Sequence, residues 1–541
     1  MRIEHVLLTI VVKNLLSNTE NAALGNEYLG VNEYVGLEYI NAHLMKNGVP
    51  SNICILPITQ LSSITAHIPS EHTLVCFSMY VDIVEPVLEA ARYVKEKYPK
   101  IPVALGGPQV TGFEAELLEQ NSQIDYIVSG EGEQTILELI QNLNNTKNMA
   151  NCAGLTYRDA TGNITQNAPR PYMKSLDDLE FPTRTIYECS KQDYLSLAGS
   201  RGCMGSCSFC EETSAKKYFG KPFVRHRTAK NIADEITYLQ NKYGVSNFRF
   251  TDPTFDDKDD NGKAKDIDVY NEIINRGLQV RMHIFSRSEL IAAKKQEDLE
   301  LARKAGVECI YIGIEGGNAY DLALYNKKAS LAESEIALQN IRNAGIHASF
   351  GFININPYTN YERLLENNAF LYRSGLGHIF YLYQTKLEVL AQTPIRKRLK
   401  QDNLLIGIPN YRLPLYSYRY RYPYMEDLQT VIAQAYIKSP TYYMDTTMSM
   451  DRIYCNRMLH NTSVYSKIES IFSQLDQLKD EIRELNFYFI NSLVEMSQNG
   501  ASLSQMQQHA QAARLERYHD LQESLFMQLK VVITKQELLK K

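Results

Sequence analysis

The sequence predicts an α/β protein with an N-terminal doubly wound parallel sheet, a partial (β/α)6 barrel and a mainly helical C-terminal region. Short apolar runs alternate with amphipathic helical segments over about the first 390 residues, which is typical of parallel sheets. The pattern then turns polar and helical. A length of 541 residues fits about three domains.

Residues 1–150 are predicted to form the first domain. Apolar runs at Val6–Val12, Thr73–Ser78 and Tyr126–Ser129 are its expected strands, and Val84–Lys97 has helical spacing. The N-terminal run superficially resembles a signal peptide, but it ends early at Lys13, so we expect a buried first strand. Ligands in such sheets bind beyond the carboxyl ends of the strands.

Residues 151–192 are predicted to form a hairpin and an extended linker, and residues 193–390 a barrel. Repeated strand–helix units predict the barrel, whose active site would lie at the carboxyl ends of its strands. The six expected strands are Tyr194–Gly199, Asn247–Thr251, Gln279–Phe285, Cys309–Ile314, Ser349–Ile353 and His378–Tyr383.

Residues 391–541 are predicted to form a helical accessory region. Within Tyr416–Tyr424, tyrosines alternate with arginines, a pattern that can stack nucleic-acid bases. The net charge of −5 favours instead a loop or edge strand on the barrel mouth. Apolar spacing over Ile468–Leu485 predicts an amphipathic helix, whose apolar face could form a dimer seam, a peptide-docking surface or core.

Composition limits the possible functions. Apolar residues make up 44% and charged residues 22% of the chain, so large cores can form. The weak negative charge gives no support for nucleic acid as the main partner. No apolar run approaches the roughly 18 residues of a membrane span. Nine cysteines at irregular spacing favour a reducing, cytoplasmic setting over a disulfide framework.

Three of the cysteines are clustered, at Cys203, Cys207 and Cys210, with the spacing C-x3-C-x2-C. Thiolates bind iron–sulfur clusters, usually four of them for a cubane, so three local ligands would leave one iron open. A structural zinc site needs four closed ligands. The nearest other candidates, Cys189 and His226, show no paired spacing. Reduced, unliganded cysteines are the third possibility.

This cysteine segment resembles the radical S-adenosylmethionine (SAM) superfamily. Its spacing, Phe209 before the last cysteine, and its place after the first barrel strand all match. The resemblance implies a [4Fe-4S] cluster held by the three cysteines, with the methionine part of SAM on the open iron. Asn326-Lys327-Lys328 also matches, whereas Asn354–Asn360 lacks the glycines of the family motif, so we expect an unusual substrate-facing mouth.

The resemblance also implies roles for residues at strand ends. The backbone of Thr251 and Asp252 would meet the methionine end of SAM. Arg287 could pair with the SAM carboxylate or form an ordinary surface salt bridge. Glu315, in Gly313–Gly317, could accept a hydrogen bond from the ribose or amine of SAM, or be a structural carboxylate.

The first domain resembles the cobalamin-binding (B12-binding) type of domain that is fused to one radical SAM class. Gly36–Ile40, then Gly106 and Gly107, then Gly130 occur in the matching order. The glycines at the strand ends would let the backbone approach cobalamin. The motif Asp-x-His-x-x-Gly is absent from the sequence, so a histidine lower ligand to cobalt is not expected. Alternatively, the domain retains the fold without the cofactor.

Together these resemblances imply an enzyme that cleaves SAM reductively to a 5′-deoxyadenosyl radical. They favour a cobalamin-dependent methyltransferase that acts on an unactivated carbon of a biosynthetic intermediate or peptide. Oxidation, cyclisation or rearrangement is the alternative chemistry, and a non-catalytic cluster- or zinc-binding scaffold is a third possibility. An external electron donor such as flavodoxin or ferredoxin is expected. No catalytic residue is assignable from the sequence, and the oligomeric state is not predicted.

Overall fold

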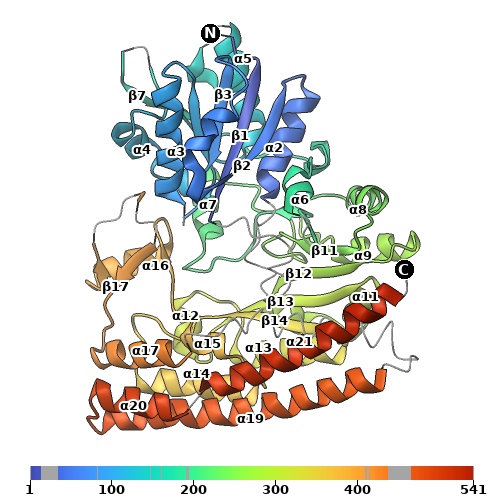
Figure 1. The fold of residues 1–541 in the computed structure, drawn as a ribbon, viewed down its shortest axis with the longest axis vertical. Coiled ribbons are helices and arrows are strands. Elements are labelled where there is room, and N and C mark those ends of the chain that lie inside the picture. The colour runs from blue at the N-terminus through green and yellow to red at the C-terminus, as the bar shows by residue number, and fades with distance from the viewer. Residues whose placement is uncertain are drawn as a thin grey trace.

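The computed structural model describes most of the chain. The described residues are 2–13, 34–81, 83–145, 148–159, 161–190, 194–407, 411–412, 415–436, 452, 465–513 and 515–539. The N-terminal domain lies at one end of the long axis, the barrel in the middle and long C-terminal helices at the other end (Figure 1). The predicted α/β class with a helical C-terminus is confirmed.

The N-terminal domain is built on a seven-stranded sheet, as far as the described residues show, in the order β2-β1-β3-β4-β5-β6-β7. The first five of these strands in spatial order are parallel, and β6 and β7 add an antiparallel hairpin. Its strands are β1 His5–Val12, β2 Ser51–Pro57, β3 Thr73–Ser78, β4 Val103–Gly106, β5 Tyr126–Val128, β6 Leu155–Arg158 and β7 Ile164–Gln166. Its helices are α2 Val35–Lys46, α3 Val84–Lys97, α4 Glu114–Gln120 and α5 Gly132–Asn145, with a 3-10 segment at Ile58–Ala66.

The strand order reverses at β1, which pairs with β2 on one side and with β3 on the other. Helix α2, which precedes β2, and helix α3, which follows β3, therefore cover opposite faces of the sheet, and a crevice lies at the carboxyl ends of β1 and β3. β1 and β3 are buried almost throughout, as expected for inner parallel strands. The carboxyl ends of β4 and β5 continue this crevice toward the barrel.

The barrel contains a five-stranded parallel sheet, within the part of the chain that the structure describes, in the order β14-β13-β12-β11-β8. Its strands are β8 Leu195–Leu197, β11 Asn247–Phe250, β12 Arg281–Arg287, β13 Val307–Glu315 and β14 His347–Phe352. Its helices are α6 Thr185–Ser190, α7 Glu211–Phe219, α8 Ala229–Tyr243, α9 Asp266–Asn275, α10 Ser288–Ala293, α11 Gln296–Lys304, α12 Ala319–Leu324, α13 Leu331–Asn343 and α14 Tyr361–Arg373. A short ribbon pairs β9 Ser200–Arg201 with β10 Arg225–His226.

The prediction of a sixth barrel strand at His378–Tyr383 is wrong. Residues Phe380–Gln384 form the short helix α15, which buries Phe380 and Leu382 and leaves Tyr381 exposed. A single parallel bridge between Ile355 and Lys386 stands where a sixth strand would pair with the sheet. The barrel is therefore more open on this side than six strands would make it.

The C-terminal region covers that open side and the base of the barrel. It comprises α15 Phe380–Gln384, β15 Val389–Leu390, α16 Pro394–Gln401, β16 Leu405–Ile406, β17 Leu415–Tyr418, α17 Tyr424–Ala435, α19 Tyr465–Gln498, α20 Leu503–Ala513 and α21 Leu515–Leu539. β17 is paired on both sides, with β15 and β16, so it is not the edge strand that we considered.

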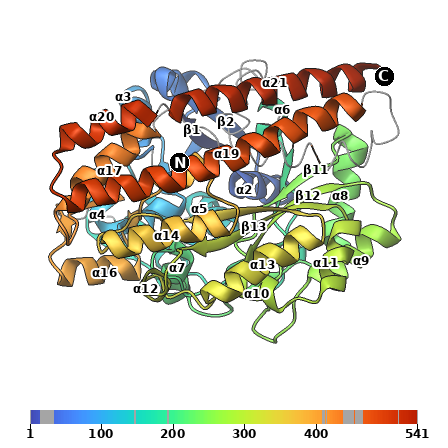
Figure 2. The same cartoon turned by 90° about the horizontal axis from the view of Figure 1, so that it is seen from below.

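The predicted amphipathic helix is present as α19, which runs beside α14 and α21 (Figure 2). Ile468 and Phe472 pack in a cluster with Phe526 of α21, and Ile482 and Phe489 join the barrel core. Of the three uses left open for this apolar face, core packing is the one observed. No helix in the described part of the chain is long and apolar enough to cross a membrane.

Candidate functional site

The clustered cysteines lie on a loop between β9 and α7, at the carboxyl end of the first barrel strand. The loop begins at Gly202, whose φ of +87° favours glycine. A Cβ atom at this position would collide with the carbonyl oxygen of Phe223. Glycine is therefore required here for the chain to turn from β9 into the loop.

Side-chain contacts from other parts of the barrel hold the cysteine loop in place. Asn326 donates from Nδ2 to the carbonyl oxygen of Ser206 at 2.7 Å, and Met204 N–H donates to Asp257 Oδ2 at 2.6 Å. Phe209 meets the edge of the buried Tyr325 ring, with centroids 5.5 Å apart. Asn326, in the segment 326–328 that resembles the family motif, thus anchors the cysteine loop.

The three thiols are partly buried and share one environment. Cys203 Sγ lies 3.4 Å from Thr254 Oγ1 and accepts from Gly205 N–H at 3.2 Å. Burial raises the pKa of all three thiols, and that of Cys210 reaches about 12. The free thiols therefore stay protonated at neutral pH, and metal binding would release their protons.

The zinc alternative gains no support from the described residues. Among them, no set of three or more His, Cys, Asp or Glu side chains is arranged around a single ion. His226 lies on β10, and the side chain of Cys189 lies outside the described residues. A cubane cluster spaces its ligands more widely than a single ion does, so the same loop still suits an iron–sulfur cluster.

Thr251 and Asp252 follow β11, beside the strand that leads to the cysteine loop. Asp252 is fully buried, and its carboxylate accepts from Gly199 N–H at 2.7 Å and from Ser200 Oγ at 2.6 Å. Lys265 Nζ lies 2.7 Å from the same carboxylate. The Asp252 side chain thus holds β8 and β9 in place, while Thr251 is exposed toward the interdomain cavity.

Arg287 ends β12 and points toward the cysteine loop. Its guanidinium forms ion pairs with Asp257 and Glu289, at 2.7 and 2.8 Å, and its side chain is only 15% exposed. Burial alone would lower the pKa of Arg287, but the two carboxylates raise it. The alternative reading of Arg287 as an ordinary surface salt bridge does not describe this arrangement. The side chain is mostly buried, and its partner Asp257 also accepts a hydrogen bond from the backbone of Met204 in the cysteine loop.

Glu315 ends β13 inside the barrel, with the unusual φ of +69° for a non-glycine residue. Such backbone strain is concentrated at functional sites. Burial raises the pKa of its carboxyl group, although Lys327 Nζ, 3.9 Å away, partly opposes this. Cys207 lies within the electrostatic reach of both side chains, so Glu315 and Lys327 belong to the surroundings of the cysteine loop.

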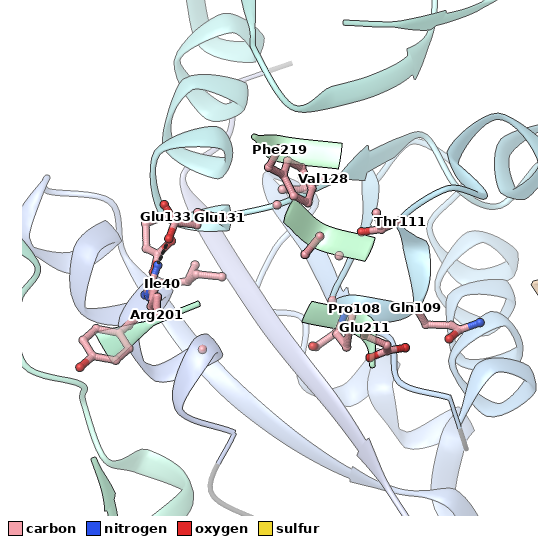
Figure 3. Close-up of a pocket in the computed structure, with 18 of the residues that line it drawn as sticks. Ile40, Pro108, Gln109, Thr111, Val128, Glu131, Glu133, Arg201, Glu211 and Phe219 are labelled. Atoms are coloured by element: carbon pink, nitrogen blue, oxygen red, sulfur yellow. Dashed lines mark hydrogen bonds and ion pairs between the residues drawn. The ribbon is translucent and has the colours of Figure 1, made fainter. Parts of the chain in front are cut away.

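A cavity of about 540 Å³ lies between the N-terminal domain and the barrel (Figure 3). Gly106, Gly107 and Gly130 line it from the sheet edge, and Gly202 and Thr251 line it from the barrel. Gly107 has a φ of +97°, and a Cβ there would lie 2.6 Å from the carbonyl oxygen of Met79. No histidine is among the described residues that line this cavity.

A second cavity, of about 1380 Å³, occupies the barrel interior and its open side. Phe209 and Glu315 line it near the cysteine loop, and Arg249 and His283 line it deeper in the barrel. The opposite wall comes from the C-terminal region, in particular Lys386–Leu390, Leu415–Tyr418 and Tyr420. The tyrosine-rich segment therefore faces the barrel mouth, as predicted, and does not form a base-stacking surface on the outside.

Family models match the two halves of this arrangement. Residues 197–371 match the radical SAM superfamily, and residues 22–140 match the B12 binding domain. The chain carries a radical SAM domain behind an N-terminal B12-binding domain. The radical SAM domain implies a [4Fe-4S] cluster and SAM, and the B12-binding domain implies cobalamin. The loop thiols and the glycine-lined cavity fit these groups.

Curated relatives of this chain include both methyltransferases and cyclases. An uncharacterized methyltransferase of Pyrococcus horikoshii is 28% identical over 269 residues, which cover 49% of this chain and 56% of the relative. An anaerobic magnesium-protoporphyrin IX monomethyl ester cyclase of Rubrivivax gelatinosus is 31% identical over 271 residues, 48% of this chain and 46% of the relative. The chain thus spans about half the length of these relatives.

Solved structures of low sequence identity share the fold. The cobalamin-dependent SAM radical enzyme OxsB, solved with aqua-cobalamin and SAM bound, superimposes with a TM-score of 0.72 at 16% identity. That match covers 98% of this chain and 81% of OxsB. The radical SAM methyltransferase TsrM of Kitasatospora setae gives a TM-score of 0.57 at 16% identity, with 74% and 76% covered.

The roles of several residues at the site were not predicted from the sequence. Asp257 and Asn326 hold the cysteine loop, while Arg201 and Arg225 border the interdomain cavity. Only Asn326 could have been found from the sequence, because it stands in the family-like segment 326–328. The other three act through partners that are distant in sequence.

Proposed function

We propose that this protein is a cobalamin-dependent radical SAM methyltransferase acting on an unactivated carbon. The observation that carries the proposal is the place of the cysteine loop, which borders both cavities. Gly202, at its start, lines the interdomain cavity, and Phe209, near its end, lines the barrel cavity. A methyl carrier in the first cavity and SAM in the second would thus meet at the same loop.

In this proposal Cys203, Cys207 and Cys210 hold the [4Fe-4S] cluster, and the cavity lined by Gly106, Gly107 and Gly130 holds cobalamin. When bound, these groups supply the electron that cleaves SAM and the carrier for the methyl group. Glu315 binds SAM from the barrel cavity and Arg287 from beside the cysteine loop, while the backbone of Thr251 and Asp252 meets SAM at the edge where Thr251 also lines the interdomain cavity. The barrel walls exclude water from the reacting atoms.

The barrel cavity is also proposed to receive the substrate. A volume of about 1380 Å³ exceeds the roughly 300–1,000 Å³ of ordinary small-molecule sites, so SAM and a second molecule fit together. Much of its wall is aromatic, including Tyr311, Tyr381 and Tyr420, which favours a substrate with a sizeable apolar or ring-bearing part.

The test is anaerobic reconstitution with iron, sulfide and hydroxocobalamin, followed by reduction with dithionite in the presence of SAM. We expect bound iron and release of 5′-deoxyadenosine from the native chain, and loss of both in Cys203→Ala, Cys207→Ala and Cys210→Ala. Cys54→Ala is the control, because Cys54 is buried in β2, apart from the cysteine loop, and lines neither cavity. Iron retained in all three variants would contradict the ligand assignment.

Methyl transfer is tested separately from SAM cleavage. A methyltransferase that draws its methyl group from SAM releases S-adenosylhomocysteine as well as 5′-deoxyadenosine. Detection of S-adenosylhomocysteine only when cobalamin is bound would support the proposal. Its absence, with 5′-deoxyadenosine still formed, would redirect the assignment to cyclisation, oxidation or rearrangement. The similarity to the Rubrivivax cyclase makes that the second candidate.

A further inference from the structure

A network of partly buried ion pairs joins the cysteine loop to one wall of the interdomain cavity. Arg201, on β9, donates to Glu131 Oε1 at 2.9 Å and to Glu133 Oε1 at 2.5 Å. Its cross-strand neighbour Arg225, on β10, reaches Glu131 Oε1 at 2.8 Å. Figure 3 shows Arg201 reaching toward the two glutamates beside Ile40. Four charged side chains thus meet at one edge of the cavity.

The network links two segments that serve different groups. Glu131 directly follows Gly130 in the loop that leads into α5, Glu133 lies in the first turn of α5, and both line the cavity. Arg201 stands two residues before Cys203, and Gly202 between them is wedged against Phe223. A displacement of the cysteine loop must therefore move Arg201, and through it the cavity wall.

Aromatic rings restrict the two arginines further. The Arg201 guanidinium lies 5.4 Å from the centre of the Tyr39 ring, and that of Arg225 lies 4.3 Å from the Tyr172 ring. Arg225 also donates to the carbonyl oxygen of Met173 at 3.0 Å. A planar guanidinium with both a ring and a carboxylate partner has few other orientations available.

The surroundings of Glu131 and Arg201 favour the charged form of each. Burial alone would raise the pKa of Glu131, but Arg201 and Arg225 outweigh it and hold that pKa below its usual range. Burial alone would lower the pKa of Arg201, but Glu133 and Glu131 raise it. Buried ion pairs add little net stability compared with apolar packing, so their effect here is to fix geometry.

We propose that Arg201 and Arg225 are positioning residues that couple the cluster site to the cobalamin site. A cluster bound to the cysteine loop fixes the loop and the backbone of Arg201 in the position seen here, and the ion pairs of Arg201 then hold the Gly130–Glu133 wall in its cobalamin-binding position. Cluster loading then tightens cobalamin binding, and cobalamin tightens the cluster site by the same factor. This inference rests on the proposed cofactor sites but not on methyl transfer.

The experiment measures the affinity for hydroxocobalamin without SAM or substrate, in cluster-loaded protein and in protein stripped of iron by a chelator. It compares the native chain with Arg201→Gln and with Glu133→Gln, a neutral side chain of the same shape. Arg412→Gln is the matched control, because Arg412 also bridges to the N-terminal domain, through Glu85 at 2.6 Å, but neither residue lines the cavity.

We expect cluster loading to tighten binding about fivefold or more in the native chain and in Arg412→Gln, a typical size for coupling between sites. In Arg201→Gln and Glu133→Gln the ratio should fall to about one. Arg201→Lys keeps the positive charge but lacks the planar guanidinium that contacts two carboxylates. It should therefore recover only part of the native affinity ratio. If Arg201→Gln does not fold, the milder Glu133→Gln decides.

A purely structural role for the network would weaken binding equally in both forms and leave the ratio unchanged, which would overturn the inference. A native ratio of one would also overturn it. If the native chain binds no hydroxocobalamin at all, the proposed cofactor set fails as well. If it binds hydroxocobalamin and the variants keep the native ratio, only the coupling fails.

Discussion

At the residue scale, the shape of the cysteine loop depends on Gly202, which has no side chain that could bind the cluster. Gly202→Ala should lose most of the reconstituted iron although every thiol remains, because its Cβ would collide with the Phe223 carbonyl at a φ of +87°. Gly220→Ala has a similar φ of +76° with nothing near its Cβ, so it separates backbone strain from collision. Equal iron content in the two variants would contradict this account.

His283, which lines the barrel cavity, gives the protein a pH dependence in its stability. Burial, reinforced by Arg249 and His347, lowers its pKa from 6.5 to about 3. The ring therefore stays neutral in the folded chain, whereas the unfolded chain takes up the proton below pH 6.5. This contribution is complete above pH 6.5 and is lost as the pH falls toward 3.

At pH 5 the loss amounts to about 2 kcal/mol, because 1.5 pH units correspond to roughly that energy. His283→Gln cannot be protonated, so the difference in unfolding free energy between pH 7.5 and pH 5 should shrink by that amount. Urea unfolding at the two pH values measures it, with His72→Gln at an exposed position as the control. An unchanged difference would show that the ring is protonated in the folded chain.

The cysteines could be predicted from the sequence because their spacing is local. Arg201 and Arg225 could not, because their partners Glu133 and Glu131 lie 68 to 94 residues away. The structural role of Asp252 could not be predicted either, since nothing in the sequence indicates that Gly199 and Ser200 will donate hydrogen bonds to its carboxylate. Ligand-binding residues at a regular spacing can be recognised in the sequence, whereas residues that stabilise loops can be identified only from their contacts in the tertiary fold.

At the scale of elements, α19 is attached to the barrel through a buried amide. Asn486 donates from Nδ2 to the carbonyl oxygen of Gly377 at 2.9 Å and accepts from the Tyr436 hydroxyl at 3.1 Å. Asn486→Ala removes the acceptor of the Tyr436 hydroxyl and one of two donors to the Gly377 carbonyl, which the Tyr383 hydroxyl also reaches at 3.2 Å, so we expect a loss of about 1–3 kcal/mol in unfolding free energy. Urea unfolding checks this against Gln477→Ala, an exposed position on the same helix. Equal losses of unfolding free energy in the two variants would show that Asn486 does not attach α19 to the barrel.

The strands show where a periodic pattern is sufficient and where it is not. Five barrel strands could be predicted because each is an apolar run between clear helical segments. The run Ile379–Tyr383 has the same aromatic, apolar character but forms a helix, since Phe380 and Tyr383 both pack on Tyr436. A five-residue apolar run does not distinguish the two structures, and only its packing partners decide.

At the scale of the whole molecule, the C-terminal region belongs to both cores rather than to a separate unit. Leu387, Tyr411 and Tyr416 join the apolar cluster of the N-terminal sheet, while Met425 and Ile482 join that of the barrel. The change of pattern near residue 390 could be read from the sequence, but not this double attachment. The region acts as a brace between the two domains and as a wall of the barrel cavity.

Because the interdomain cavity is lined from both domains, its ligand should stabilise both together. At a hydroxocobalamin concentration of 100 times Kd, binding adds about 2.7 kcal/mol to the unfolding free energy. We expect calorimetry of cluster-free protein to show the same upward shift for the unfolding of the N-terminal sheet and of the barrel. SAM alone, without hydroxocobalamin, is the control.

The two domains can be followed separately by protease cleavage during heating. Cleavage within the N-terminal domain and within the barrel should become protected in parallel, because Arg201 and Arg225 of the barrel form ion pairs with the cavity wall. Protection confined to the N-terminal domain would mean that its sheet binds the ligand alone. In that case the barrel side of the cavity would be a neighbour of the cobalamin site and not part of it.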